Sequence, residues 1–293
     1  MAKRCRGTTR AGKQCSITQD SSLTNDGGRL AAEPLRRGGA YCLFHAKPFC
    51  TRPAAEDARN TVAILLDLET TGVDTTRDRV VEIAALHCPA NPRFFGSAFS
   101  TVVRVAPEVL VQRGPAATAV HGISDEEVAT GPDFPVAWRR FLSWTDAVLN
   151  AAVVESPDSD DDVPALPQLL PEPVLVLAGH NAFGFDFPVL LSECLRHGLS
   201  CACFGRWLFA DTLQASQTIV AHGCRKLQCM VRTFGSSTDL RAHRALDDCV
   251  ALRHVGIAWA ELLGEDLPAL LRRAALEVDL DTSLAQLSVL MDL

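Results

Sequence analysis

After residue 60, apolar runs of different lengths divide the chain into predicted strands and helices. TVAILLDLETTG (61–72) is an apolar run that ends in carboxylates and a turn signal, which is typical of a buried central strand. VVEIAALHC (80–88) and FGSAFSTVVRV (95–105) follow as β-rich runs. The turn-forming segment CPANPR separates these last two runs. Because the successive strands lie so close together in the sequence, we expect an antiparallel meander.

The second half of the chain alternates between the two patterns. Residues 174–181 (VLVLAGHN) and 206–216 (RWLFADTLQAS) are predicted strands, the second of which runs into a turn. Helical spacing is found in 187–199 and, most clearly, in 241–264, with an earlier helix over 132–144. Strands that first follow one another closely and are then separated by helices indicate an α/β fold, a mixed sheet flanked by helices.

Composition separates the predicted α/β domain, which ends near residue 264, from the segments around it. Residues 1–50 are poor in apolar side chains and rich in Gly and Arg, so we expect a small separate module there, joined by a linker at 51–60. Residues 155–173 contain five prolines and six acidic residues, which predicts a surface insertion without a core. The tail, 265–293, is predicted to be helical and to serve packing or partner contact.

Charge is distributed unevenly along the 293 residues, whose net charge is −7. Residues 1–60 contain eleven Lys and Arg against five Asp and Glu, or +6, so the remainder carries −13. No apolar run approaches the ~20 residues that span a bilayer, and residues 1–10 have no apolar stretch of a secretory signal. We therefore expect an intracellular protein, cytoplasmic or nuclear, whose eleven cysteines are reduced thiols or metal ligands.

Asp67 and Glu69 stand two positions apart at the end of the first apolar run. Side chains at positions i and i+2 of a strand project from the same face of the sheet. Burying two like charges side by side costs free energy unless cations neutralise them. The pair therefore indicates a metal site, although a strand end where both carboxylates reach water explains it equally well.

Two further segments contain residues of the same chemistry. Asp186 lies in HNAFGFDFP, between a strand and a helix N-terminus, where side chains either form sites or cap helices. His243 and Asp248 lie in HRALDDC. Because five positions on an ideal helix leave two side chains about 140° apart, we place His243 on the loop before the helix and Asp248 on the helix. A loop His near fixed carboxylates suits a general base.

DLETTG, HNAFGFD and HRALDD resemble the three motifs of the DEDDh 3′-to-5′ exonucleases, a family that includes RNase T and the proofreading subunit of bacterial DNA polymerase III. HGISDEE (121–127) is similar to the linker region of the same family, and the resemblance covers residues 61–262. It implies an RNase H-like fold with a five-stranded mixed sheet over 61–264. It also implies a phosphodiester hydrolase that releases nucleoside 5′-monophosphates from nucleic-acid 3′ ends.

By this resemblance, Asp67, Glu69, Asp186 and Asp248 hold two Mg²⁺ or Mn²⁺ ions, and His243 takes a proton from the attacking water. Two divalent ions about 3.5–4 Å apart can stabilise both the attacking and the leaving oxygen. Hard cations favour oxygen ligands, which agrees with a set of carboxylates.

The spacing of the third motif decides two further assignments. The family spacing selects Asp248 over Asp247, which we expect to be solvated or to lie outside the metal ligands. A sister branch has Tyr four positions before the last Asp; Arg244 stands there, so only the His branch fits.

The resemblance also implies substrate contacts through Thr70, Thr71 and Asn181. HNAFGFDFP is more similar to the three-prime repair exonucleases than to the shorter proofreading motif, which favours DNA 3′ ends, with single-stranded DNA as the expected partner. A 3′-to-5′ exoribonuclease of the same family remains an alternative. A non-catalytic nucleic-acid-binding module is a second alternative, although no metal ligand of the family is missing.

The basic N-terminal segment offers a candidate zinc site in Cys5, Cys15, Cys42 and His45. Three thiolates and one imidazole form a closed tetrahedral set, and Cys-x-x-His is a familiar half-site for Zn²⁺. Metal binding would stabilise a segment with so few apolar residues. Cys50 could replace one ligand, and a disordered basic arm with incidental thiols is the alternative.

The remaining cysteines suggest packing rather than chemistry. Cys194, Cys201, Cys203 and Cys249 fall in or beside apolar patterns, where small buried side chains are expected. His222, Cys224 and Cys229 could form half of another metal site, but no second half is evident, so we do not predict one.

Overall fold

The computed structural model describes residues 51–53, 60–154, 173–220, 223–235 and 244–291. The proposed zinc ligands Cys5, Cys15, Cys42 and His45, the acidic insertion up to residue 172, and His243 lie outside these residues. Residues 51–279 form one compact unit, which contains every described helix and strand except α10.

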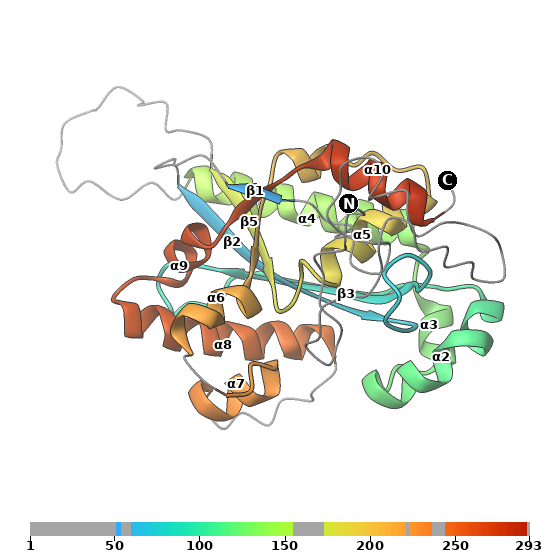
Figure 1. The fold of residues 1–293 in the computed structure, drawn as a ribbon, viewed down its shortest axis with the longest axis horizontal. Helices are drawn as coiled ribbons and strands as arrows, with labels where there is room; N and C mark the ends of the chain where they lie inside the picture. Colours follow the sequence, from blue (N-terminus) through green and yellow to red (C-terminus); the bar gives the residue numbers. More distant parts are fainter. Residues whose placement is uncertain (1–50, 54–59, 155–172, 221–222, 236–243, 292–293) are drawn as a thin grey trace, which may run out of the picture. The chain divides into compact units, whose positions relative to one another are not determined.

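A mixed sheet with the order β1-β7-β6-β5-β2-β3-β4 forms the middle of this unit (Figure 1). The pairing β2-β3-β4 is antiparallel, so the predicted meander is confirmed, while β5 and β6 run parallel to β2. The strands are β1 (Thr51–Pro53), β2 (Thr61–Thr70), β3 (Val80–Cys88), β4 (Ala98–Val102), β5 (Val174–Gly179), β6 (Leu208–Asp211) and β7 (Leu276–Val278).

The predicted α/β class is confirmed, but the sheet has seven strands among the described residues where we expected five. The two additional strands, β1 and β7, have three residues each and pair with one another. Residues 276–278 were predicted to be helical, which is wrong for this stretch. Strands this short have no periodicity of their own, and they form because β7 can add to the edge of β6.

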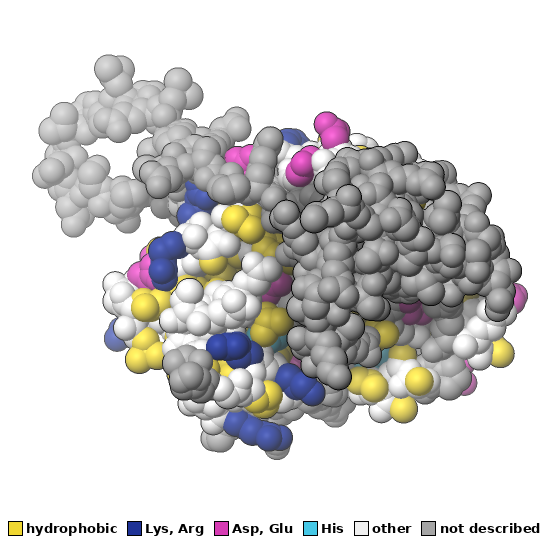
Figure 2. Space-filling model, in the orientation of Figure 1, with side chains coloured by type: hydrophobic (Ala, Val, Ile, Leu, Met, Phe, Trp, Pro, Cys, Tyr) yellow, Lys and Arg dark blue, Asp and Glu magenta, His cyan; other side chains and the backbone are white. Residues whose placement is uncertain are grey.

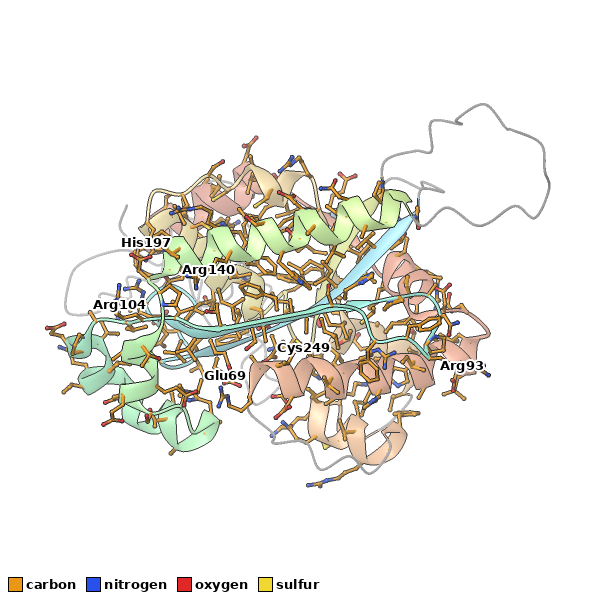
Figure 3. All side chains as sticks on the ribbon, turned by 180° about the vertical axis from the view of Figure 1, so that it is seen from behind. Glu69, Arg93, Arg104, Arg140, His197 and Cys249 are labelled. Carbon is orange, nitrogen blue, oxygen red and sulfur yellow. A yellow bond between two sulfur atoms is a disulfide. The ribbon has the colours of Figure 1, made fainter. Side chains whose placement is uncertain are left out.

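Helices cover both faces of the sheet. Helices α7, α8 and α9 lie on one face and α4 and α5 on the other; Figures 1 and 3, viewed from opposite directions, both show α4 and α8 on the two sides of the sheet. The helices are α2 (Pro107–His121), α3 (Asp125–Thr130), α4 (Phe134–Val154), α5 (Asp186–Arg196), α6 (Thr212–Ile219), α7 (Leu227–Phe234), α8 (Ala245–Leu263) and α9 (Leu267–Arg273), with a 3₁₀ turn, η2 (Ala202–Gly205).

Several helices differ from the sequence expectation. α4 continues ten residues beyond the predicted end at residue 144, α6 forms where a turn was predicted, and α2, α3 and α7 were not predicted. The sequence of α2 contains Gly114 and Pro115 and has no clear apolar face, so its helical state depends on tertiary context rather than on periodicity. No described helix is both long enough and apolar enough to cross a membrane. Helix α10 (Leu280–Leu290) falls outside the unit formed by residues 51–279.

The α8 face of the sheet contains the row of side chains that leads to the site. Ala63 and Leu65 of β2 are buried against α8, which contributes Cys249, Val255 and Trp259 to the same core. Because side chains of a strand alternate between its faces, the row continues along β2 on the same side. The next two positions in this row are the carboxylates Asp67 and Glu69.

Aromatic rings fill the opposite side of the sheet. Phe187 of α5 and Phe209 of β6 meet edge to face, with ring centroids 4.9 Å apart. Phe204 stacks on Phe209 and also on Trp138 of α4, with centroid distances of 5.8 and 5.9 Å. This packing fixes the first turn of α5, and therefore Asp186, against the ends of the strands.

Candidate active site

The structure brings together carboxylates from β2 and α8. One carboxylate oxygen from each of three residues, Asp67, Glu69 and Asp248, lies within 4.8 Å of the other two. These oxygens are close enough together to hold one cation. In Figure 3, Glu69 lies on the face of the sheet that α8 covers, as does Cys249, whereas Arg140 lies on the α4 side. The strand alternation predicted for Asp67 and Glu69 is therefore present, and their side chains do meet.

Asp248 reaches this cluster because the first turn of α8 is held tightly against the sheet. Its backbone N–H donates to the carbonyl oxygen of Arg244 at 3.0 Å, which closes the first helical turn. The next residue, Cys249, is fully buried, and its Sγ lies 3.6 Å from the carbonyl oxygen of Ala84 and 3.8 Å from that of Leu65. A small thiol at this position lets the helix approach β2 and β3 closely.

Glu82, which the sequence analysis did not single out, anchors the start of α8. It is buried on β3 directly opposite Glu69. Its carboxylate accepts hydrogen bonds from Arg244 at 2.9 and 3.2 Å and from the backbone N–H of Ala245 at 3.1 Å. Arg244 also pairs with Glu127 of α3 at 3.2 Å. The signal that could have identified Glu82 is a charged residue within an otherwise apolar strand, VVEIAAL.

Asp186 is the first residue of α5 and is buried at the ends of β2 and β5. It does not belong to the group of three within 4.8 Å, but its charge is close enough to raise the pKa of both Asp67 and Glu69. Gly179, at the end of β5, makes room for this arrangement: a Cβ there would lie 2.9 Å from the carbonyl oxygen of Leu66 and 2.9 Å from the Cβ of Ala182.

The four acidic side chains are electrostatically strained without a cation. Burial, followed by the charges of Asp186, Asp248, Glu69 and Glu82, raises the pKa of Asp67 well above its usual range. Burial and the neighbouring carboxylates raise the pKa of Glu69 to about 8. Burial raises the pKa of Asp186 to about 7, and backbone hydrogen bonding partly opposes that rise. A bound divalent cation would neutralise the negative charges of these carboxylates, so the donor set fits Mg²⁺ or Mn²⁺.

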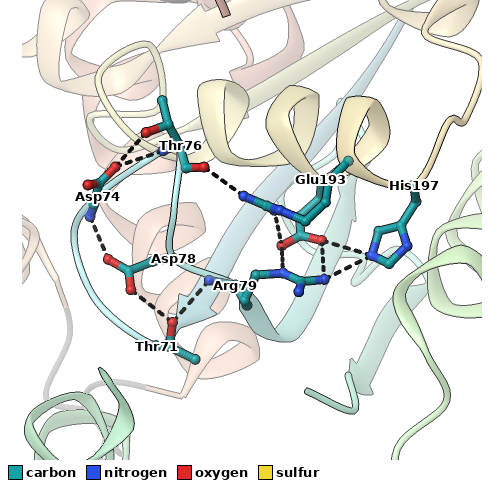
Figure 4. Close-up of polar contacts among 8 residues, drawn as sticks. Thr71, Asp74, Thr76, Asp78, Arg79, Glu193 and His197 are labelled. Atoms are coloured by element: carbon teal, nitrogen blue, oxygen red, sulfur yellow. Dashed lines mark hydrogen bonds and ion pairs between the residues drawn. The ribbon is translucent and has the colours of Figure 1, made fainter. Parts of the chain in front are cut away.

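Thr70 ends β2 and Thr71 begins the loop to β3, which is folded on itself through Asp78 (Figure 4). The carboxylate of Asp78 accepts from the hydroxyl of Thr71 at 3.0 Å and from the backbone N–H of Asp74 at 2.7 Å. The hydroxyl of Thr70 donates to the carbonyl oxygen of Gly72 at 2.5 Å. Both threonines are buried, and their hydroxyls shape this loop.

Glu193 ties the same loop to α5 (Figure 4). Arg79 donates to both oxygens of Glu193, at 2.6 and 3.1 Å, and Arg196 donates to Glu193 at 2.8 Å and to the carbonyl oxygen of Thr76 at 2.7 Å. Burial alone would raise the pKa of Glu193, but hydrogen bonds from His197 and Arg79 and the two guanidinium charges hold it below its usual value. The loop after Glu69 and the helix that begins at Asp186 are thus held in one arrangement.

Asp211, a second residue that the sequence analysis missed, shapes the loop between β5 and α5. Its carboxylate accepts hydrogen bonds from the backbone N–H groups of Asn181 at 2.9 Å and Phe183 at 3.1 Å, and it caps α6 through Leu213 at 2.9 Å. Asn181 is exposed and has a φ of 66°, a left-handed conformation that Asn tolerates better than most residues. An Asp at the carboxyl end of a buried strand was the available signal.

Cys224 and Cys229 form a disulfide, so the expectation of reduced thiols or metal ligands is wrong for this pair. Their side chains come together because the turn before α7 brings the helix's first turn back over Cys224, a proximity that the sequence spacing alone does not reveal. The predicted burial of Cys194, Cys201, Cys203 and Cys249 is confirmed.

The raised pKa values predict how stability depends on pH. Glu69 has an ordinary pKa of 4.5 when unfolded and about 8 in the folded, metal-free protein. Between these values the folded state binds more protons, so stability falls as pH rises. In EDTA the melting temperature should therefore decrease from pH 5 to pH 8.5, and Mg²⁺ should raise it more at pH 8.5 than at pH 5.

Glu69→Gln is the matched variant for this measurement because it removes the titrating group and keeps its size. The difference between wild type and Glu69→Gln isolates the contribution of this carboxylate from that of other groups. An identical pH dependence in the two proteins, with or without Mg²⁺, would contradict the prediction.

Part of the chain is similar in sequence to known proteins. Residues 64–159 match the family model described as Exonuclease. A DNA polymerase III subunit epsilon-like protein from Rhodobacter capsulatus is 36% identical over 157 residues, which are 53% of this chain and 20% of that protein. The chain therefore spans about one fifth of this curated relative.

Solved structures share the fold at low sequence identity. The nuclease domain of 3′hExo, a DEDDh family member bound to rAMP, is 16% identical, with a TM-score of 0.53 over 71% of this chain and 95% of that one. Exonuclease I of E. coli, solved with an oligonucleotide, is 16% identical, with a TM-score of 0.52 over 73% of this chain and 43% of that one. The RNase H-like architecture is confirmed by these matches. Residues 64–159 are thus similar in sequence to the Exonuclease family, and the fold around them is shared with a nuclease domain of the DEDDh family.

Proposed function

We propose that the chain hydrolyses phosphodiester bonds at nucleic-acid 3′ ends and releases nucleoside 5′-monophosphates, with DNA as the favoured polymer. The observation that supports this most is the convergence of Asp67, Glu69 and Asp248, with Asp186 close by, at the end of the strands of an exonuclease domain. Ionised carboxylates this close together repel one another, and bound divalent cations relieve that repulsion.

Asp67, Glu69, Asp186 and Asp248 would hold the two cations. Bound there, Mg²⁺ or Mn²⁺ would supply charge stabilisation for the attacking and leaving oxygens of an in-line displacement. Arg244 and Glu82 would act indirectly, because their ion pair keeps the first turn of α8, and with it Asp248, at the sheet.

His243 is the proposed general base. It immediately precedes Arg244, the residue that caps α8, and would accept the proton of the attacking water. Asn181 is proposed to contact the substrate near the scissile phosphate, because its side chain is exposed beside the start of α5. Thr70 and Thr71 are proposed to bind the 3′-terminal nucleotide through the loop that their hydroxyls shape.

Single-stranded DNA is the proposed substrate. The curated relative is named for a subunit of DNA polymerase III, and the HNAFGFDFP motif resembles the three-prime repair exonucleases. Proteins of similar fold include both an exonuclease I–ssDNA complex and a 3′-exonuclease that recognises a histone mRNA stem-loop. Degradation of RNA alone would therefore identify the exoribonuclease alternative, since a 2′-OH is what distinguishes the polymers.

The experiment is degradation of matched, end-labelled DNA and RNA single strands with Mg²⁺. Wild type should release 5′-mononucleotides from DNA, and His243→Ala should be about 10²–10⁴-fold slower because it lacks the general base. The rate of wild type should rise as pH increases through the ordinary imidazole pKa of about 6.5.

Two results would count against this function. Binding of oligonucleotides by folded wild type without turnover, unaffected by EDTA, would identify a non-catalytic binding module. A rate that stays flat from about pH 5 to 9 would remove the proposed role of His243.

The basic segment before the exonuclease domain is proposed to bind Zn²⁺ through Cys5, Cys15, Cys42 and His45. The support is the donor set itself, three thiolates and an imidazole ending in Cys-x-x-His.

A further inference from the structure

The segment between Asp211 and Asp239 contains no acidic residue, although the chain after residue 60 is strongly acidic. Helix α7 lies in this segment, and Lys226 and Arg232 are its exposed cations. Figure 2 shows dark-blue Lys and Arg side chains gathered over α7. Within the described part of the chain, neither of these two side chains has an ion-pair partner.

Helix α7 separates apolar from polar side chains sharply. At 100° per residue, Leu227, Met230, Val231 and Phe234 share one arc, and the first two are buried in the core of the α8 face. Lys226, Gln228, Cys229, Arg232 and Thr233 fall on the opposite arc. The solvent face of α7 thus contains cationic and neutral polar side chains and no carboxylate.

The turn that begins α7 is hydrogen-bonded to the segment that follows β5. His180 follows the last residue of β5 and precedes Asn181; its Nε2 lies 2.7 Å from the carbonyl oxygen of Arg225, and its Nδ1 lies 3.0 Å from the hydroxyl of Thr212. Because Lys226 is the next residue after Arg225, the start of α7 is placed at the same end of the sheet as the carboxylates.

Two further contacts brace this turn. The disulfide joins Cys224, just before the turn, to Cys229 in the first turn of α7. The guanidinium of Arg225 donates to the carbonyl oxygen of Val220 at 2.8 Å. Lys226 therefore projects from a segment whose backbone is held at both ends.

From these observations we infer that the solvent face of α7 binds the phosphodiester backbone of the strand being degraded, with Lys226 and Arg232 as its cations. This rests on the proposed exonuclease function. A polyanion that approaches a carboxylate cluster on an acidic domain is repelled, and cations beside the site offset that repulsion. Contacts to phosphates do not depend on base identity, so the surface would hold any sequence behind the 3′ end.

The test compares two double variants that remove the same charge. Lys226→Gln/Arg232→Gln neutralises the α7 face, and Arg139→Gln/Arg140→Gln neutralises two exposed arginines of α4, on the opposite side of the sheet. For a single strand of about 20 nucleotides, the KM of the α7 variant should be about tenfold higher than that of wild type. Its kcat should change less than its KM. The α4 variant should behave as wild type.

Salt dependence provides a readout that a merely structural role would not change. Each phosphate contact to a single strand contributes about 0.7 to the slope of log affinity against log salt, so loss of two contacts should reduce the slope by about 1.4. The KM effect should shrink for a dinucleotide, which offers a single phosphodiester.

Failure of this inference can be distinguished from failure of the proposed exonuclease function. Equal KM values and equal salt slopes for the two double variants would overturn the inference, while turnover by wild type would leave the exonuclease function intact. If wild type shows no turnover, fluorescence anisotropy of a labelled strand in EDTA tests the surface alone: a reduced salt slope for the α7 variant supports it, and an unchanged slope rejects it.

Discussion

Asp248→Asn should reduce exonuclease turnover about 10³-fold, whereas Asp247→Asn should leave it within a few-fold of wild type. The two residues are neighbours in the first turn of α8, and both side chains are partly buried. Only Asp248 places an oxygen within 4.8 Å of Asp67 and Glu69. Loss of a cation ligand removes several kcal/mol of transition-state stabilisation, and each 1.36 kcal/mol corresponds to a factor of ten in rate.

Adjacent residues make this a closely matched comparison. Both variants remove one carboxylate from the same helical turn, so general effects of charge on substrate attraction are the same. Initial rates on end-labelled single-stranded DNA at saturating substrate measure the difference, and the stabilisation of each variant by Mg²⁺ in thermal melts reports on cation binding. Equal activity of the two variants would show that Asp248 is not a ligand.

Phe209→Ala should destabilise the protein by about 3–5 kcal/mol. Phe209 is completely buried on β6 and contacts Phe187 and Phe204, so the shorter side chain leaves a cavity under α5. Because Phe187 directly follows Asp186, the cavity should also loosen the position of that carboxylate and lower activity below the melting temperature.

Equilibrium unfolding in urea measures the loss, and Phe94→Ala is the control. Phe94 is 63% exposed, so its truncation should change the free energy of unfolding by less than about 0.5 kcal/mol. A Phe209→Ala protein within about 1 kcal/mol of wild type would mean that the surrounding rings collapse into the space and that α5 does not depend on them.

Much of the fold could be predicted because its longer elements have local signals. β2, β3 and β5 are apolar runs of 6–10 residues, and α8 has helical spacing over most of its length. β1, β7 and α2 could not be predicted in this way. β1 and β7 have three residues each and exist through pairing with each other across more than 200 positions of sequence, and α2 has no clear apolar face.

In the candidate site, too, residues with a local sequence signal were predicted and residues that depend on distant partners were not. The spacing of Asp67 and Glu69 predicted that both face one side of β2, because strand alternation is a local property. Glu82, Arg244 and Asp211 were missed, since each acts through a partner that is distant in sequence. The disulfide between Cys224 and Cys229 was missed for a different reason, because its formation depends on how the turn before α7 closes.

The sequence alone therefore determined the class of fold, the positions of the main strands along the chain and the acidic residues with which the site could be built. Hydrophobic period and motif spacing allow this because they are properties of neighbouring residues. Only the tertiary structure decided that α8 approaches β2 closely enough for Asp248 to meet Asp67 and Glu69. That approach depends on the buried Cys249 and on the ion pair between Arg244 and Glu82. Contacts of this kind depend on packing between distant segments, which no local pattern specifies.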